Sequence, residues 1–335
     1  MIVRSTFIFF VFLLTGCTQK EELKVQRSFY YWKSAFSLSQ KEKQLLKDLS
    51  VHHLYVKFFD VSWDPVQNAA RPVAKILFSE TPADDILITP VVFITNETVQ
   101  QINQELIDSL AGNISKLLLS SSDNLPLSNE VQIDCDWTTN TKEKYFQLLQ
   151  SLRKQFFFKN KTLSATIRLH QLKFVSENGV PPVDKALVMC YNMGNLRHPQ
   201  TKNSIIETGE IKKYISNLNH YPLPVDIALP VFDWWVKFSG NRYEGLVHSF
   251  YLPDSLKLKE RLYFKSDTLL NGIEFKQGEW LRYEGSSINV LKECIYSLNK
   301  KLKSGELNVI LYHLDENNLK KYTVYELENI YNSFH

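Results

Sequence analysis

The chain has 335 residues, of which 44% are hydrophobic and 22% charged, with 11 glycines and 12 prolines. This composition is that of a globular protein, and it excludes a disordered chain, a collagen-like chain and a small disulfide-stabilised domain. The 39 basic and 36 acidic residues leave a formal net charge of +3, so no nucleic-acid partner is expected, because such partners usually require a strongly basic face.

The N-terminus has the features of a secretion signal. Arg4 precedes an unbroken apolar run over residues 7–14, which is too short to span a bilayer as a helix, since that takes about 20 residues. The sequence Leu14-Thr15-Gly16-Cys17 resembles the end of a bacterial lipoprotein signal, which is cleaved before a cysteine that then becomes acylated, with palmitate among the usual chains. The resemblance implies a signal peptide over residues 1–16, lipidation of Cys17 and a tether over residues 17–27. A chance cysteine after an ordinary signal peptide is the alternative.

The residues that follow Cys17 bear on location. Thr18-Gln19 lacks the aspartate that often retains lipoproteins in the inner membrane. Lys20-Glu21-Glu22 resembles a short surface-export signal of some Gram-negative bacteria, although a solvated tether is the plainer interpretation. We therefore expect a protein held in the outer membrane by acyl chains, without a transmembrane helix in the mature chain. Both the cell surface and the periplasmic side remain open.

Eight apolar runs follow, and most alternate with helix-like segments such as the one from Glu97 to about Leu119. Continuous apolar runs, rather than strict alternation, are typical of parallel strands that are buried on both faces. The pattern predicts an α/β fold, a (β/α)8 TIM barrel over residues 28–335. The expected strands are residues 29–32, 54–59, 86–94, 131–137, 163–169, 186–191, 225–232 and 307–312.

One stretch interrupts this alternation. Residues 239–285 are rich in Tyr, Lys and Gly and contain hairpin-like pieces. We interpret them as an insertion between the seventh and eighth strands, because a barrel-like strand returns at Leu307. A separate small domain from Ser239 onward is the alternative.

Function in such a barrel is expected at the C-terminal ends of the strands, and the fourth strand is the most informative. Side chains two positions apart point the same way, so Asp134, Asp136 and Thr138 should share one face. The residues between them are apolar and should pack against helices, which turns the acids into the barrel. Two close carboxylates in an interior are costly unless paired, protonated or placed at a site, and such a pair raises one pKa toward that of a general acid. A structural hydrogen-bonding pair is the alternative.

Residues 131–138, Val-Gln-Ile-Asp-Cys-Asp-Trp-Thr, resemble the strand-four signature Asp-Gly-x-Asp-x-Asp-Trp-Glu of family 18 glycoside hydrolases, the chitinase-like barrels. Residues 189–192 are similar to that family's Met-x-Tyr-Asp, and residues 229–235 to its Leu-Pro-Phe-Tyr-Gly-x-x-Trp. The resemblance implies an oligosaccharide ligand and, in an active enzyme, catalytic roles for Asp134, Asp136 and Tyr191. In the family the substrate's own acetamido group attacks, assisted by the residues that match Asp136 and Tyr191.

The departures from the family pattern concern the chemistry directly. The first Asp of the signature falls on Val131, the proton-donating Glu on Thr138 and the strand-six Asp on Asn192. A threonine hydroxyl cannot act as a general acid near neutral pH. Hydrolysis by the usual route is therefore expected to be absent unless another acid substitutes, and the candidates are Asp64, Asp233, Asp315 and Glu316.

The remaining candidate ligand-binding residues lie at expected strand ends. Aromatic faces there can stack on sugar rings, although core packing is the alternative and is favoured for Trp137. Arg168 and His170 should share a face of the fifth strand, where they could meet the strand-four acids. Together with Thr138, the candidates are Trp63, Asp64, Arg168, Asn192, Asp233, Trp234, Trp235 and Tyr312.

The sequence lacks the phosphate-binding and zinc-binding motifs that would indicate a cofactor or metal, so none is expected. We expect a lipid-anchored barrel that binds glycans without the usual family 18 hydrolysis. An active glycoside hydrolase with a relocated acid and a non-catalytic scaffold lipoprotein are the two alternatives, since fold alone does not fix function.

Overall fold

The computed structural model describes residues 23–247 and 260–335. The expected signal peptide, Cys17 and residues 18–22 of the expected tether lie outside the described residues. Residues 23–27, which were also expected in the tether, form the start of the first barrel strand and pair with residues 305–309. Within the described ranges, no helix combines the length and the apolar character needed to cross a membrane.

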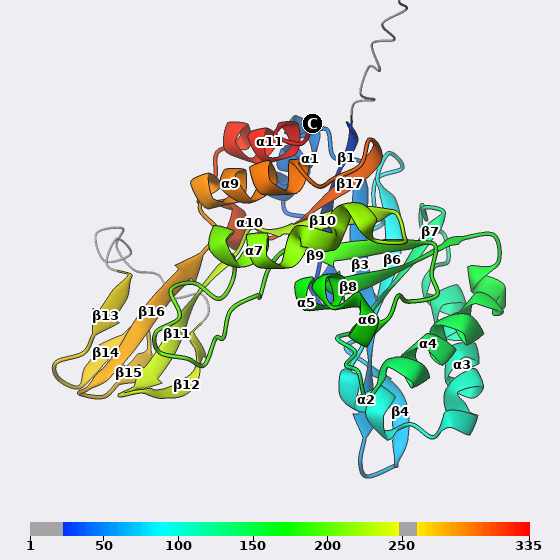
Figure 1. Ribbon diagram of the computed structural model, residues 1–335, viewed down its shortest axis with the longest axis horizontal. Helices are drawn as coiled ribbons and strands as arrows, with labels where there is room; N and C mark the ends of the chain where they lie inside the picture. Colours follow the sequence, from blue (N-terminus) through cyan, green and yellow to red (C-terminus); the bar gives the residue numbers. More distant parts are fainter. Residues whose placement is uncertain (1–22, 248–259) are drawn as a thin grey trace, which may run out of the picture.

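A closed barrel of eight parallel strands forms the centre of the molecule (Figure 1). Each strand pairs with the next around the ring, and β1 closes it by pairing with both β17 and β3. The predicted TIM barrel is thus confirmed, and each of the eight predicted runs supplies one strand. These strands are β1 (Leu23–Tyr31), β3 (His53–Asp64), β6 (Leu87–Ile94), β7 (Glu130–Asp134), β8 (Thr162–Arg168), β9 (Lys185–Met189), β10 (Val225–Pro230) and β17 (Gly305–Tyr312).

Helices cover the outside of the barrel, and their ends are set by local sequence. Ser39 and Thr323 each accept a hydrogen bond from the backbone of a glutamate three residues later, and that glutamate bonds back to the cap backbone; this is a capping box. The helices are α1 (Gln40–Asp48), α2 (Asn96–Gln101), α3 (Ile107–Ser121), α4 (Lys142–Arg153), α5 (Leu169–Lys173), α6 (Val175–Asn178), α7 (Thr208–Tyr214), α9 (Ile288–Asn299), α10 (Glu316–Leu319) and α11 (Val324–Asn332), with 3-10 turns η1 (Gln104–Leu106), η2 (Phe156–Phe158) and η3 (Ile215–His220).

The sequence predicted a single helix from Glu97 to about Leu119, and the structure corrects this prediction, because two helices, α2 and α3, occupy the segment. The chain leaves helical geometry at Ile102, whose backbone is extended, and it resumes as α3 at Ile107. Ile102 and Ile107 are both buried. The break therefore serves core packing, which a periodic pattern alone does not reveal.

The lower part of the barrel interior holds a layer of buried polar side chains. The Lys185 ammonium lies 2.6 Å from Asp226 and 3.1 Å from Glu130. The Tyr55 hydroxyl donates to Glu130 at 3.2 Å and accepts from the Asn308 amide at 2.8 Å. This network fills the barrel below the C-terminal mouth, so the interior is a packed core there.

An antiparallel sheet projects from one side of the barrel between β10 and β17 (Figure 1). It begins at Asp233, ahead of the boundary at Ser239 that the sequence suggested, and ends at Gly285. In the run from Asp233 to Phe238 the apolar residues continue past the end of β10 and are interrupted by Asp233 and Lys237 alone, so the transition has only a weak compositional signal. The sheet has the order β12 (Arg242–Val247), β11 (Asp233–Ser239), β16 (Glu279–Gly285) and β13 (Arg261–Tyr263), and a hairpin of β14 (Thr268–Leu270) and β15 (Ile273–Phe275) lies beside it.

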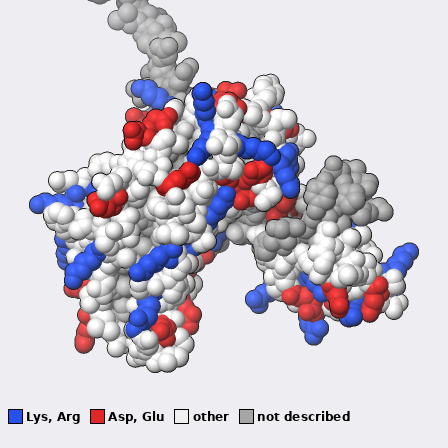
Figure 2. All heavy atoms as spheres, turned by 180° about the vertical axis from the view of Figure 1, so that it is seen from behind, with Lys and Arg blue, Asp and Glu red and all other residues white. Residues whose placement is uncertain are grey.

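A smaller excursion extends β3 past the barrel. Its last residues pair antiparallel with β4 (Ala69–Val73), and a two-stranded piece forms between β2 (Ala35–Phe36) and β5 (Leu77–Phe78). Asp64 closes the β3–β4 turn by accepting from the backbone amides of Val66 and Gln67. The face of the molecule shown in Figure 2 has basic and acidic side chains interspersed, in agreement with the small net charge.

Candidate functional site at the mouth of the barrel

A cavity of about 400 Å³ lies at the C-terminal mouth of the barrel. Aromatic and charged side chains at the ends of β3, β7, β8, β9 and β17 form much of its lining, and the small sheet adds one wall. The lining residues are Trp32, Lys57, Asp60, Phe93, Asp134, Asp136, Arg168, Met189, Tyr191, Asn192, Phe232, Asp233, Trp234, Tyr312, His313 and Asn318. Its volume is within the usual range of small-molecule sites, about 300–1,000 Å³.

Asp134 is the buried acid of this cavity. Its Oδ1 accepts a hydrogen bond of 2.6 Å from the Thr166 hydroxyl. Burial, and then the nearby Asp136 carboxylate, raise the pKa of Asp134 to about 6. The expected alternation along β7 also holds, because Trp137 is buried on the opposite face, stacked on Tyr145 at 5.1 Å between ring centroids.

Asp136 is held by Arg168. The guanidinium donates from Nε to Oδ1 at 2.6 Å and from Nη2 to Oδ2 at 2.7 Å, the two-pronged geometry that makes arginine–carboxylate pairs specific. The Asp136 side chain is 45% exposed and that of Arg168 22%. Both oxygens of the carboxylate that the resemblance assigns to catalysis are therefore engaged by a permanent cation.

His170 does not share a strand face with Arg168, which corrects that expectation. β8 ends at Arg168, whose backbone amide donates to the Gln171 side chain at 2.7 Å. The chain then enters α5, where His170 is exposed. The helix begins at Leu169, which is the last residue of the expected strand.

Thr138, at the position of the family's proton donor, is exposed and does not line the cavity. Its backbone amide donates to the Thr141 hydroxyl at 2.9 Å, and its carbonyl accepts from Lys142 at the start of α4. The residue thus serves the turn into a helix. The sequence predicted that Thr138 binds the ligand, but the structure places this residue outside the cavity.

Aromatic rings form one wall of the cavity. Tyr191 and Tyr312 lie 5.3 Å apart between ring centroids, and Trp32 lies 5.7 Å from Tyr312. Burial raises the pKa of Tyr191, and that of Tyr312, above the ordinary tyrosine value, so both hydroxyls are protonated at neutral pH. These rings offer apolar faces with hydrogen-bonding edges.

Trp234 belongs to the small sheet and is fixed there. Its indole Nε1 donates to Glu284 at 2.8 Å, and Glu284 forms a fully buried ion pair with Arg282 at 2.7 Å. The ring stands 5.2 Å from Phe232 in the cavity wall. Trp235 faces the other side, against Tyr283 within the core of the small sheet, as expected for adjacent strand residues.

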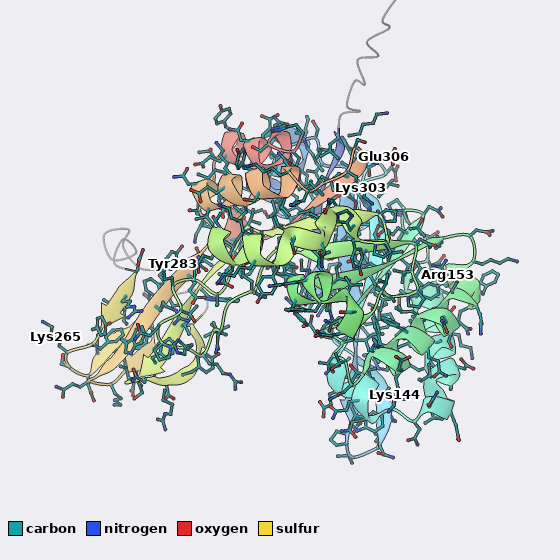
Figure 3. All side chains as sticks on the ribbon, viewed as in Figure 1. Lys144, Arg153, Lys265, Tyr283, Lys303 and Glu306 are labelled. Atoms are coloured by element: carbon teal, nitrogen blue, oxygen red, sulfur yellow. The ribbon has the colours of Figure 1, made fainter. Side chains whose placement is uncertain are left out.

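Asp233 lines the cavity next to Trp234. Its Oδ2 accepts from the Tyr283 hydroxyl at 2.8 Å and lies 3.0 Å from the Lys321 ammonium. Tyr283, labelled in Figure 3, thus bonds to Asp233 within the small sheet, and the contact with Lys321 connects Asp233 to the segment before α11.

The other candidates for a substitute acid lie away from the cavity. Asp64 closes the β3–β4 turn, and Trp63 lies on that same extension. Asp315 accepts from the first backbone amides of α10, and Glu316 pairs with Lys41 at 2.6 Å. Of the four proposed acids, Asp233 alone is among the cavity residues.

Several residues that line the cavity were not among the ligand-binding residues predicted from the sequence. Lys57 lies 2.9 Å from Asp60, with its ammonium 5.5 Å from the centre of the Trp32 ring. An irregularity in β3 between Lys57 and Phe59 changes the phase of alternation, so residues three apart face the same way. His313 and Asn318 contact each other at 3.1 Å, and burial lowers the pKa of His313. The rule of strand ends points to Asp60 and His313, but nothing in the sequence signals the bulge.

The described residues contain no cluster of three or more metal-binding side chains. Cys135, Cys190 and Cys294 are free and buried. The polar groups of the cavity are carboxylates, an arginine, a lysine, a histidine, amides and hydroxyls, a set that suits hydrogen bonding to a polyhydroxylated ligand.

No protein-family model matches the sequence, and no curated protein matches it. Solved structures match over nearly the whole chain. The spore cortex-lytic enzyme SleL of Bacillus cereus is 12% identical with a TM-score of 0.56, covering 94% of this chain and 75% of SleL. A chitinase from Chromobacterium violaceum is 10% identical with a TM-score of 0.54, covering 93% and 98%. A GH18 chitinase from Cycas revoluta in complex with (GlcNAc)3 is 12% identical with a TM-score of 0.51, covering 92% and 100%.

These likenesses define a class of fold. The chain is a closed (β/α)8 barrel, a fold that it shares with the chitinases and SleL above, with an added antiparallel sheet at its mouth.

Proposed function

We propose that the chain is a lipid-anchored protein of the bacterial outer membrane whose barrel cavity binds an oligosaccharide without the hydrolysis usual for family 18. The observation that carries this proposal has two parts. The cavity has an aromatic wall, and the residue at the position of the family's proton donor, Thr138, lies outside the cavity in the turn that leads into α4. A ligand made of N-acetylglucosamine units is the first choice, because a neighbour of this fold is complexed with (GlcNAc)3.

The chemistry of the cavity supports binding over cleavage. Trp32, Trp234 and Tyr312 can contact sugar rings, and the surrounding acids and amides can accept or donate to hydroxyls. Cleavage needs a protonated group near the leaving oxygen and a free carboxylate beside the acetamido group. Thr138 cannot supply the first, and the two oxygens of Asp136 are occupied by Arg168.

Titration calorimetry with chito-oligosaccharides and a broad panel of other glycans tests the proposal. We expect saturable binding to at least one glycan and no release of reducing ends on long incubation. Trp234→Ala should weaken binding, whereas Tyr325→Ala should not, because Tyr325 is an exposed aromatic residue on α11 outside the cavity. Absence of binding across the panel would refute the proposal and favour the scaffold alternative.

An active hydrolase is the second candidate, and the ionisation of Asp134 favours it. A carboxyl group with a pKa of about 6 keeps a proton under mildly acidic conditions and can serve as a general acid. If product forms, it must fall sharply in both Asp134→Asn and Asp136→Asn. If both variants still form product at the original rate, hydrolysis must occur at a site other than this cavity.

The anchor and the location rest on the sequence before Leu23. Cys17 would be the lipidated residue, and the acyl chains would hold the barrel at the membrane. Mass spectrometry of the N-terminal peptide from native membranes tests this directly, because a diacylated or triacylated Cys17 is expected and an unmodified one would refute the anchor.

A further inference from the structure

The end of the barrel opposite the cavity carries an apolar and basic patch. We define this lysine–phenylalanine patch as Leu119, Lys154, Phe156, Lys159 and Lys161. Phe156 is 76% exposed and Leu119 53% exposed, and both line a groove of about 470 Å³ together with Lys159 and Lys161. Large apolar side chains this exposed, adjacent to one another, mark a contact surface.

The patch is net positive, because its three lysines outnumber Asp123, the acidic residue that lines the same groove. Among residues 23–247 and 260–335, none of its three lysines has a carboxylate within ion-pair distance, whereas the nearby Arg153 pairs with Asp184 at 2.9 Å. The ammonium of Lys161 instead lies 5.6 Å from the centre of the Phe157 ring. An exposed phenylalanine and leucine surrounded by lysines is the composition of surfaces that insert shallowly between anionic lipid headgroups.

The patch and the start of the described chain lie at the same end of the barrel. All eight barrel strands are parallel, Phe156 precedes β8, and Leu23 begins β1. In the order β1-β17-β10-β9-β8, β8 lies across the barrel from β1. The patch and the tether are therefore two separated points on one end face. In Figure 3, Lys303 marks the start of β17 beside β1 and Arg153 lies on the same side, while Lys265 lies at the far tip of the small sheet.

The length of the tether brings this face to the membrane. Leu23 follows Cys17 by six positions, which can span at most about 20 Å. If Cys17 is the anchor, as the proposed function holds, the nearest part of the molecule to the bilayer must be the N-terminal end of the barrel. The patch on that end would then meet the headgroups.

We propose that the lysine–phenylalanine patch docks on an anionic lipid surface and, with the lipidated Cys17, holds the barrel with its cavity facing away from the membrane. In this arrangement the tether limits the distance between the barrel and the membrane, and the patch sets the tilt of the barrel relative to the membrane plane. A glycan would then reach the cavity from the solvent side without passing the bilayer.

Lysine footprinting on vesicles tests the docking. The chain from Cys17 onward is coupled through that thiol to a maleimide lipid, since the three other cysteines are buried, in vesicles of phosphatidylethanolamine and phosphatidylglycerol. Acetylation rates are then read by mass spectrometry. We expect the rates at Lys154 and Lys159 to fall roughly fivefold or more relative to the free chain, and the rate at Lys265 to change less than about twofold.

Matched double variants separate docking from mere tethering. Phe156→Ser with Lys159→Glu should abolish the protection of Lys154. Leu269→Ser with Lys265→Glu makes the same changes on the small sheet, where Leu269 is 70% exposed, and should leave the protection intact. Equal protection of Lys154 and Lys265, or protection that survives the first double variant, would overturn the proposal.

The coupled vesicles also keep this test independent of the natural anchor. An unmodified Cys17 in native membranes would refute the lipid anchor alone. Absence of protection on the vesicles would refute the docking alone, even if Cys17 proves to be acylated.

Discussion

The Asp136–Arg168 pair should stabilise the fold as well as occupy the site. The perturbation is a double-mutant cycle of Arg168→Met and Asp136→Asn, compared with the same changes in the surface pair Arg153–Asp184. The first pair makes two charge-assisted hydrogen bonds, at 2.6 and 2.7 Å. The second lies at 2.9 Å with both side chains at least 40% exposed.

The expected magnitudes follow from this difference in exposure. A hydrogen bond to a charged group contributes about 1.5–3 kcal/mol when buried, and solvent at the 45% exposed Asp136 reduces that contribution. We therefore expect a coupling free energy of about 2 kcal/mol for Asp136–Arg168, against less than about 1 kcal/mol for the exposed pair.

The assay is urea unfolding at pH 7, followed by both tryptophan fluorescence and circular dichroism, so that two-state behaviour is checked by coincident transitions. A coupling for Asp136–Arg168 no larger than that of Arg153–Asp184 would refute the reasoning. It would mean that the guanidinium does not hold the carboxylate in solution, and Asp136 would then be free for catalysis.

Three other predictions follow from the site and the tether. Thr138→Glu should not create hydrolysis of chito-oligosaccharides, because that side chain lies outside the cavity; measurable product would contradict the placement. The folded pKa of Asp134, about 6, is raised above the ordinary 3.8, so its protonation contributes stability that is present below about pH 4 and lost as pH rises through 6. Asp134→Asn should therefore flatten the pH dependence of the unfolding free energy between pH 4 and 6, and an unchanged slope would count against the raised pKa. Cys17→Ala should move the protein from the membrane to the soluble fraction on cell lysis; continued membrane association would exclude the acyl anchor.

The barrel could be predicted because its strands are long apolar runs buried on both sides, which leave a clear trace in the sequence. The alternation on β7 likewise placed Asp134 and Asp136 inside and Trp137 outside. The alternation continues past the last paired residue, Asp134, as far as Trp137, and it fails at Thr138, where the chain turns toward α4. Periodicity cannot show where a strand gives way to a turn.

The missed residues have physical reasons of the same kind. The irregularity in β3 brings Lys57 and Asp60 to one face, although a spacing of three excludes this in a regular strand. Trp63 and Asp64 follow the same strand but leave the barrel with the β3–β4 extension. The boundary at Asp233 is difficult to recognise because apolar residues continue from β10 into β11, where Trp234, Trp235 and Val236 follow directly. Each error lies where the chain departs from regular geometry, at a bulge or at the end of a strand, and there tertiary contacts rather than local composition decide its path.

The hydrogen bond from Trp234 to Glu284 has a thermodynamic consequence. Part of the cavity wall is supplied by the small sheet and held by an ion pair buried inside that sheet. A ligand that contacts Trp234 must bind more tightly when the sheet is folded than when it is not. By linkage, the ligand stabilises the sheet by the same free energy. Saturating glycan should therefore slow amide hydrogen exchange in β11 and β16 more than in the helices on the far side of the barrel.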